Sequence, residues 1–142
     1  MAERPERSAY RVFYPITTRW MDNDLYGHVN NVVYYSYFDT VVNLYLMEAG
    51  GLDIHTGPVV GYVVNSGCTY HAPLGYPDRL EGGLRIERIG NSSVQYGVAI
   101  FKAGGKTASA HGHMVHVFVD RNANKPVQVP ARVQAALERI RA

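Results

Sequence analysis

One long segment with the periodicity of a helix lies in a chain whose other patterns are mainly those of strands. Between residues 32 and 48, large apolar side chains recur every three or four positions, which is the spacing of a wide helical face. This face consists of Tyr34, Tyr37, Phe38, Val41, Val42, Tyr45 and Leu46. The paired Gly50 and Gly51 predict the C-terminal end of the helix. Because the face is broad and partly β-branched, the helix needs burial against other elements to be stable.

The rest of the chain shows mainly the two-residue period of strands. Apolar residues alternate from Tyr10 to Trp20, and Pro15 within this run favours an edge strand or a bulge. Four more strands are predicted, over residues 59–71, 80–89, 92–102 and 106–120. A short amphipathic helix then begins at Pro130. This order predicts an α+β fold in which an antiparallel sheet curls around the one long helix.

Composition narrows the class of protein further. The 142 residues fit one domain, and 46% hydrophobic and 18% charged residues are typical of a globular chain. A net charge of +2 without a run of Lys or Arg argues against nucleic-acid binding, and no apolar stretch is long enough to span a membrane. The single cysteine, Cys68, fits a cytoplasmic location. Charged residues 1–8 predict a flexible N-terminal arm before a single domain over residues 9–142.

The densest group of polar side chains lies directly before the long helix. It comprises Asp22, Asn23, Asp24, His28, Asn30 and Asn31. A helix N-terminus offers unpaired backbone N–H groups and the positive end of the dipole, which can polarise a carbonyl or hold an oxyanion. A nearby carboxylate can attack an acyl group or activate water. Such a loop can also simply turn the chain and cap the helix, through Asn30 or Asn31.

Metal binding has weaker support in the sequence. Asp22 and Asp24 are two residues apart in a loop, which is weak evidence for a metal site. His111 and His113 share one face of a strand but have no evident third ligand. Cys68 lies in a strand pattern without a neighbouring His, as is typical of a packing residue. The sequence therefore predicts no metal site.

Residues 22–35, with the sequence DNDLYGHVNNVVYY, resemble the Asp-x-Asp-x-x-Gly-His-Val-Asn-Asn-x-x-Tyr signature of hotdog-fold acyl-CoA thioesterases of the 4-hydroxybenzoyl-CoA thioesterase type. The similarity continues in the same order at residues 72–78, 89–94 and 115–120. It implies the hotdog fold, a sheet wrapped around the long helix. It also implies a homodimer whose two sheets join edge to edge, often paired into a homotetramer, with the active site at the subunit interface.

The resemblance also implies catalytic roles for three residues of the polar loop. Asp24 is the catalytic carboxylate, either as nucleophile or as general base for water. The backbone N–H of Asn31 polarises the thioester carbonyl, although certain branches of the family have His at this position. His28 either orders the loop and the helix start or transfers protons.

These features together predict an acyl-CoA thioesterase that converts acyl-CoA and water into a carboxylic acid and free coenzyme A. The residues expected to bind substrate are Tyr26, Asn30, Tyr34 and Tyr37. For the two helical tyrosines, core packing is the alternative role. No metal or redox cofactor is implied, because coenzyme A is part of the substrate.

Two other functions remain open at this point. One is the same reaction on acyl carrier protein, and the other is a non-catalytic module that binds acyl-CoA. Asp24 argues against the second function, because pure binding of an anionic thioester gains nothing from a carboxylate beside the acyl carbonyl.

Overall fold

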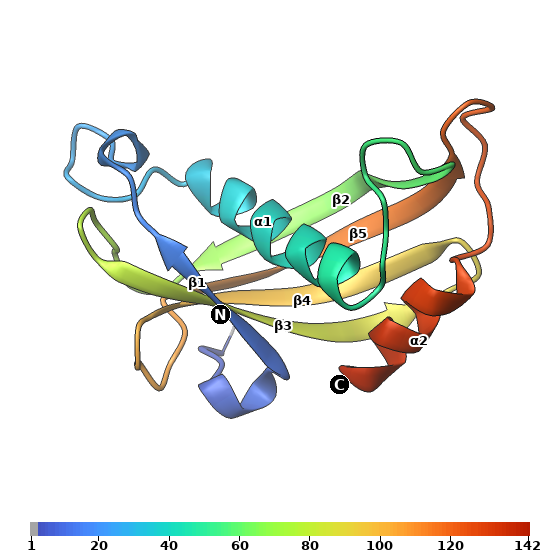
Figure 1. Ribbon diagram of the computed structural model, residues 1–142. Helices are drawn as coiled ribbons and strands as arrows, with labels where there is room; N and C mark the ends of the chain where they lie inside the picture. Colours follow the sequence, from blue (N-terminus) through green and yellow to red (C-terminus); the bar gives the residue numbers. More distant parts are fainter. Residues whose placement is uncertain (1–2) are drawn as a thin grey trace.

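The computed structural model describes residues 3–142 and shows one antiparallel sheet around a long helix (Figure 1). The strands are β1 (Val12–Thr17), β2 (Val59–Tyr70), β3 (Arg79–Ile89), β4 (Ser93–Lys102) and β5 (Ala110–Asp120), and they lie in the order β1-β3-β4-β5-β2. The α-helices are α1 (Val33–Glu48) and α2 (Ala131–Arg139). Two short 3₁₀ turns, η1 (Arg7–Ala9) and η2 (Trp20–Asp22), flank β1. The predicted α+β class and the predicted order of elements are confirmed.

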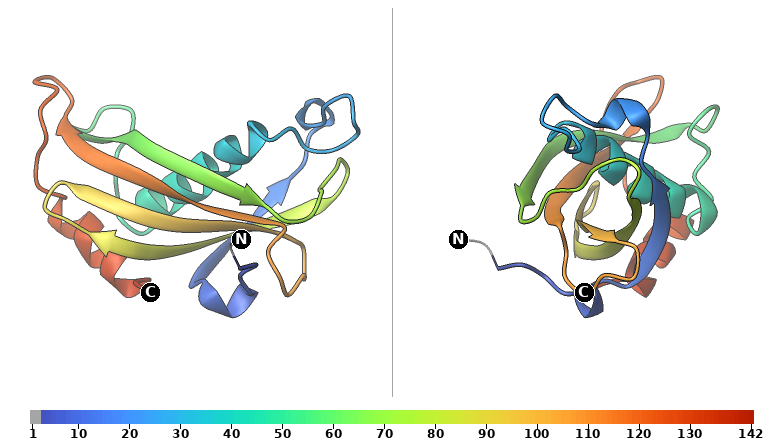
Figure 2. Two further views of the ribbon diagram at one scale, coloured as in Figure 1. Left: turned by 180° about the vertical axis from the view of Figure 1, so that it is seen from behind. Right: turned by 90° about the vertical axis from the view of Figure 1, so that its left-hand side faces the viewer.

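The central helix α1 is held by the face that the sequence predicts. All seven residues of that face are buried, and the sheet curls around the helix (Figure 2). Met114 and Phe118 of β5 belong to the same core and are at most 2% exposed. At Gly82 of β3 a Cβ atom would come within 2.3 Å of Val41 Cγ2, so only glycine allows helix and strand to approach this closely. Within residues 3–142, no helix is long and apolar enough to cross a membrane.

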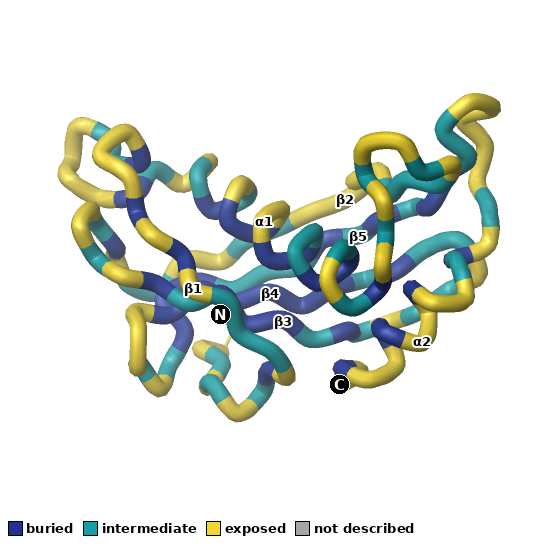
Figure 3. The backbone as a smooth tube through the Cα atoms, viewed as in Figure 1, coloured by how far each residue is buried: buried dark blue, intermediate teal, exposed yellow. Residues whose placement is uncertain are grey.

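Strands β1 and β2 form the two edges of the sheet. Pro15 lies in β1, which confirms the predicted edge strand, but this strand is shorter than the alternating run from Tyr10 to Trp20. Trp20 instead belongs to η2 and is 82% exposed. Strand β2 is paired along one side only, with β5, and its central residues 62–66 are exposed (Figure 3). One long strand edge is therefore open within the described chain.

The segment before β1 makes contacts that the sequence does not predict. The Arg7 guanidinium forms an ion pair with Glu81, with 2.7 Å between Nη2 and Oε1. It also lies over the aromatic rings of Phe13 and Phe101, 4.7 and 5.0 Å from their centroids. Charge and cation–π contacts can order a segment that has little apolar surface of its own. These contacts favour a docked segment over the flexible arm expected from the sequence.

Deletion of residues 1–8 tests this difference, although residues 1 and 2 lie outside the described residues. We expect the deletion to lower the melting temperature by about 2–8 °C, because the Arg7 contacts together contribute about 1–2 kcal/mol and a domain of this size shifts by about 2–4 °C per kcal/mol. Thermal unfolding followed by circular dichroism measures the shift. An unchanged melting temperature would support the flexible arm instead.

Candidate active site

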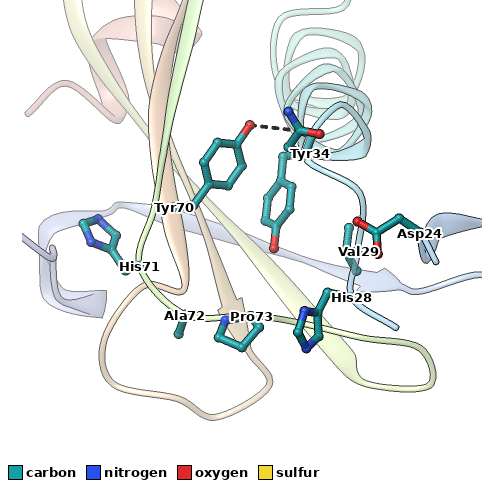
Figure 4. Close-up of a pocket in the computed structure, with 9 residues that line it drawn as sticks. Asp24, His28, Val29, Tyr34, Tyr70, His71, Ala72 and Pro73 are labelled. Atoms are coloured by element: carbon teal, nitrogen blue, oxygen red, sulfur yellow. Dashed lines mark hydrogen bonds between the residues drawn. The ribbon is translucent and has the colours of Figure 1, made fainter. Parts of the chain in front are cut away.

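A cavity of about 370 Å³ lies where the loop before α1, the first turn of α1 and the end of β2 meet (Figure 4). It is lined by Asp24, His28, Val29, Asn31, Tyr34, Tyr70, His71, Ala72 and Pro73. Four of the residues predicted for the site are therefore brought together, namely Asp24, His28, Asn31 and Tyr34. The other three predicted residues, Tyr26, Asn30 and Tyr37, do not line this cavity.

The loop that carries Asp24 folds back on itself. The Asp24 N–H donates to the His28 carbonyl at 2.8 Å, and the Asp24 carbonyl accepts from Gly27 N–H at 3.1 Å. Gly27 has a φ of +81°, a left-handed conformation that glycine adopts without steric cost. The Asp24 Oδ1 atom accepts the Tyr26 N–H at 2.8 Å, whereas its Oδ2 atom accepts no hydrogen bond from residues 3–142. One carboxylate oxygen is thus held, and the other is available to a ligand.

The backbone N–H of Asn31 makes no hydrogen bond to any residue of the described chain, and Asn31 lines the cavity. Its carbonyl accepts the Tyr70 hydroxyl at 3.0 Å, which fixes the peptide at the start of the helix. The predicted cap is wrong, because the N-cap position is Val32 and has no side-chain cap. Asn30 Oδ1 instead accepts the Val32 N–H at 3.1 Å, in a turn just before the helix. Asn30 therefore shapes the backbone rather than the cavity.

Asp22 is fully buried and has a structural role beside the site. Its carboxylate accepts the Tyr37 hydroxyl at 2.7 Å, the Arg19 N–H at 2.9 Å and the Arg19 guanidinium. Burial alone would raise the pKa of Asp22, but these hydrogen bonds and the Arg19 charge outweigh it and lower the pKa below its ordinary value. The hydrogen bond from the Tyr37 hydroxyl to Asp22 also holds the Tyr37 side chain against the loop. This explains why Tyr37 supports the loop and does not reach the cavity.

The lowered pKa of Asp22 predicts a specific loss of stability in acid. A carboxylate whose folded-state pKa is lowered stabilises the fold above its ordinary pKa of 3.8, and this stabilisation is lost as the pH falls through the folded-state value. The free energy of unfolding of the wild type should therefore fall steeply below about pH 4. Asp22→Asn should be less stable than the wild type at pH 7, and it should lose this part of the acid dependence. Urea unfolding between pH 3 and pH 7 measures both curves, and parallel curves would contradict the assignment.

Two further predicted residues lie near the surface of the loop. The Tyr26 side chain is 87% exposed, so its predicted role as a wall of the substrate channel is not supported within one chain. His28 is exposed, lines the cavity, and its imidazole makes no hydrogen bond to residues 3–142. The loop is ordered by the His28 carbonyl rather than by its side chain.

The end of β2 and the residues after it form a wall of the cavity that the sequence pattern does not predict. Tyr70 packs edge-to-face on Tyr34, with ring centroids 5.0 Å apart, and the loop is tied to this segment because Val29 N–H donates to the Leu74 carbonyl at 2.7 Å. Residues 72–78 formed part of the resemblance, but no role was assigned to them. Their position depends on a contact between segments about 40 residues apart in sequence. Local patterns carry no signal for such a contact.

The histidine pair considered for metal binding has other partners. The His71 side chain points to the opposite side of β2 from Tyr70 (Figure 4), and its Nε2 atom shares a hydrogen bond of 2.8 Å with His111 Nδ1. His113 Nε2 lies 2.7 Å from Asn65 Oδ1. Within residues 3–142, no group of three or more His, Cys, Asp or Glu side chains is arranged to hold a metal ion.

Comparison with known proteins identifies the family. The thioesterase superfamily model matches residues 26–109, which is more than half of the chain and begins two residues after Asp24. The PA5185 protein from Pseudomonas aeruginosa strain PAO1 is 54% identical over 99% of this chain and 98% of its own, with a TM-score of 0.97. A comparison with the curated proteins gives no match. The chain belongs to the thioesterase superfamily and is a thioester hydrolase, as the resemblance implied.

More distant structures share the fold. Slr0204, a 1,4-dihydroxy-2-naphthoyl-CoA thioesterase from Synechocystis, is 20% identical over 88% of this chain and 93% of its own, with a TM-score of 0.76. The BH1999 gentisyl-coenzyme A thioesterase is 22% identical over 89% of this chain and 99% of its own, with a TM-score of 0.79. The arrangement of sheet and central helix is the hotdog fold that the resemblance implied.

Proposed function

We propose that this protein hydrolyses acyl-CoA to a carboxylic acid and free coenzyme A, with Asp24 as the catalytic carboxylate. One observation carries the proposal. The Asp24 carboxylate, whose Oδ2 atom accepts no hydrogen bond from residues 3–142, lines the same cavity at the N-terminus of α1 as the Asn31 N–H, which also has no partner among those residues. An acceptor for a proton or an attacking group thus lies beside a donor for the carbonyl oxygen, which is the pair of groups that acyl transfer to water requires.

The reaction proceeds through a tetrahedral adduct. Either an Asp24 oxygen or a water deprotonated by Asp24 forms a bond to the acyl carbon, and the π-electron pair of the carbonyl moves onto its oxygen. The Asn31 N–H and the positive end of the α1 dipole stabilise this negative charge. The pair then returns, the C–S bond breaks, and its electrons leave on the sulfur of coenzyme A as a thiolate. The thiolate takes up the proton that Asp24 removed from water or, where Asp24 is the nucleophile, a proton from solvent. If Asp24 is the nucleophile, water hydrolyses the resulting anhydride in a second step.

Release of free thiol across a panel of acyl-CoA substrates tests this function. The panel covers short and long alkyl groups and aromatic groups, and one acyl group is also offered on acyl carrier protein. We expect turnover of at least one acyl-CoA at a higher kcat/KM than its carrier-protein counterpart. A higher kcat/KM with the carrier-protein substrate would show that the protein is an acyl carrier protein thioesterase. Binding of acyl-CoA without release of thiol would favour the non-catalytic acyl-CoA-binding module. No cofactor is added to the assay, because none is expected to take part in the reaction. We also propose a cytoplasmic location, as expected from the sequence.

We also propose that the protein is a homodimer, or a pair of such dimers, joined through β2. The open edge of this strand exposes a row of backbone N–H and C=O groups, and its Tyr62, Val63 and Val64 side chains are 47%, 46% and 59% exposed. A long apolar strand edge of this kind favours pairing with a second chain. An edge-to-edge dimer would place partner residues next to Tyr70, which lies on β2 and lines the cavity.

Light scattering at micromolar concentration tests the assembly. We expect the wild type to have the mass of two or four chains, and Val64→Lys to shift it toward one chain, because a charge on an exposed strand edge opposes pairing. Arg11→Ala on the other edge of the sheet is the control and should keep the wild-type mass. A wild type with the mass of a single chain would contradict the β2 interface.

A further inference from the structure

The Tyr34 hydroxyl is open to the cavity and has no hydrogen-bond partner within residues 3–142, although the rest of the residue is buried. The Tyr34 residue is only 3% exposed, yet its hydroxyl makes no hydrogen bond to residues 3–142. The ring extends from the first turn of α1, and the hydroxyl points into the cavity between Asp24, His28 and Pro73 (Figure 4). A hydroxyl that faces the cavity without a partner from the protein can donate a hydrogen bond to a molecule bound there.

Neighbouring aromatic rings hold this hydroxyl in place. Tyr70 and Tyr37 pack edge-to-face on the Tyr34 ring, with centroids at 5.0 and 6.1 Å. Tyr37 is itself fixed by its hydrogen bond to the buried Asp22. The hydroxyl is therefore a preorganised donor, which is the kind of group that stabilises charge at little reorganisation cost.

The chemistry of the cavity narrows what this hydroxyl can bind. Burial raises the pKa of Tyr34 to about 12, so the group keeps its proton at neutral pH and acts as a donor rather than as a base. Asn31, three positions earlier, lines the same cavity and has a backbone N–H without a hydrogen-bond partner in the described part of the chain. Residues three apart lie on the same side of a helix, and helical side chains lean toward its N-terminus. Two donors in the cavity that Asp24 also lines suit an oxygen that only accepts, such as a thioester carbonyl.

We propose that the Tyr34 hydroxyl is the second donor to the thioester carbonyl oxygen, beside the Asn31 N–H, and that it stabilises the tetrahedral oxyanion. This inference rests on the proposed thioester hydrolysis. When the bond to the acyl carbon forms and the π-electron pair moves onto oxygen, Tyr34 retains its proton and strengthens its hydrogen bond. When the C–S bond breaks, the pair returns and coenzyme A leaves with the electrons of that bond. Tyr34 is thus a catalytic residue that transfers no proton.

Tyr34→Phe tests the proposal, because it removes the hydroxyl and keeps the ring that packs on Tyr37 and Tyr70. We expect kcat to fall about 10²-fold with little change in KM, as for loss of one oxyanion donor. Tyr14→Phe is the matched control. Tyr14 lies in β1, its hydroxyl also makes no hydrogen bond within residues 3–142, and it does not line the cavity. Tyr14→Phe should retain wild-type kcat.

An infrared measurement reads the same hydrogen bond without turnover. The Asp24→Asn protein is loaded with hexanoyl-CoA or benzoyl-CoA labelled with ¹³C at the thioester carbonyl, and the carbonyl band is compared with that in the double variant Asp24→Asn, Tyr34→Phe. Loss of a donor to the carbonyl moves this band to higher wavenumber. We expect this shift in the double variant Asp24→Asn, Tyr34→Phe. We expect no shift in the control double variant Asp24→Asn, Tyr14→Phe.

The outcomes separate this inference from the proposed function. A band that stays in place overturns the assignment of Tyr34, whatever the effect on kcat, and leaves thioester hydrolysis intact. A band that moves in a protein whose wild type releases no thiol supports Tyr34 as a carbonyl donor and overturns hydrolysis. Failure of every variant and of the wild type to bind either thioester overturns both.

Discussion

We expect Asp24→Asn to lower the thioesterase turnover by about 10²–10⁴-fold while the fold stays intact, because the proposed role of Asp24 is that of a positioned acid–base group and this is the range for removal of one. Asn keeps the size of Asp and an oxygen that can accept the Tyr26 N–H at the position of Oδ1. It carries no negative charge, so it can neither attack the acyl carbon nor take a proton from water. Thiol release at saturating acyl-CoA measures the loss, and circular dichroism checks the fold.

Asp22→Asn is the matched control two residues earlier in the loop. Asp22 is buried and bonded to Tyr37 and Arg19, so its loss should reduce stability more than chemistry. At a temperature well below its melting point, Asp22→Asn should keep turnover within about tenfold of the wild type. Equal losses in the two variants at that temperature would mean that the carboxylates act as a unit. Near-normal turnover in Asp24→Asn would rule out its catalytic role.

Phe38→Ala reduces the free energy of unfolding by about 3–5 kcal/mol, a large share of the 5–15 kcal/mol typical of a whole domain. Phe38 is 0% exposed in the middle of α1, and its ring lies against β5, where a Cβ atom on Gly112 would meet Phe38 Cε2 at 2.9 Å. Truncation leaves a cavity between helix and sheet that neither element can close. Urea unfolding measures the change.

Ser36→Ala on the same helix is the control for Phe38→Ala. Ser36 is exposed, its side chain makes no hydrogen bond within residues 3–142, and Ala has the higher helix propensity. The change should therefore alter stability by less than about 0.5 kcal/mol. A Phe38→Ala protein as stable as this control would show that the helix is not held through its predicted apolar face.

Local periodicity was sufficient to predict most of the fold. The predicted helical face is the buried face of α1, and the predicted strands agree with β2 to β5 within a few residues. These elements are long and strongly patterned, so burial follows directly from spacing. The first strand was predicted too long, because alternation continued through residues that form the 3₁₀ turn η2. The contacts of Arg7 were missed because cation–π and ion-pair contacts leave no periodic pattern.

The site was predictable only where its residues adjoin in sequence. Asp24, His28, Asn31 and Tyr34 lie within eleven consecutive positions, and the structure brings all four to one cavity. Tyr37 shares the helical face of Tyr34 but points its hydroxyl at Asp22, a difference set by the path of the loop rather than by the spacing. The wall formed by the end of β2 depends on sheet order and strand register, which no single segment encodes.

Product analysis of the wild type tests whether this protein hydrolyses acyl-CoA through Asp24. The enzyme is incubated with the acyl-CoA that the panel shows to be turned over fastest, and carboxylic acid and free coenzyme A are separated and quantified over many turnovers. We expect equal amounts of the two products from the wild type and a parallel loss of both, by about 10²-fold or more, in Asp24→Asn. Intact acyl-CoA after incubation with the wild type, or product formation that is independent of Asp24, would contradict hydrolysis through Asp24.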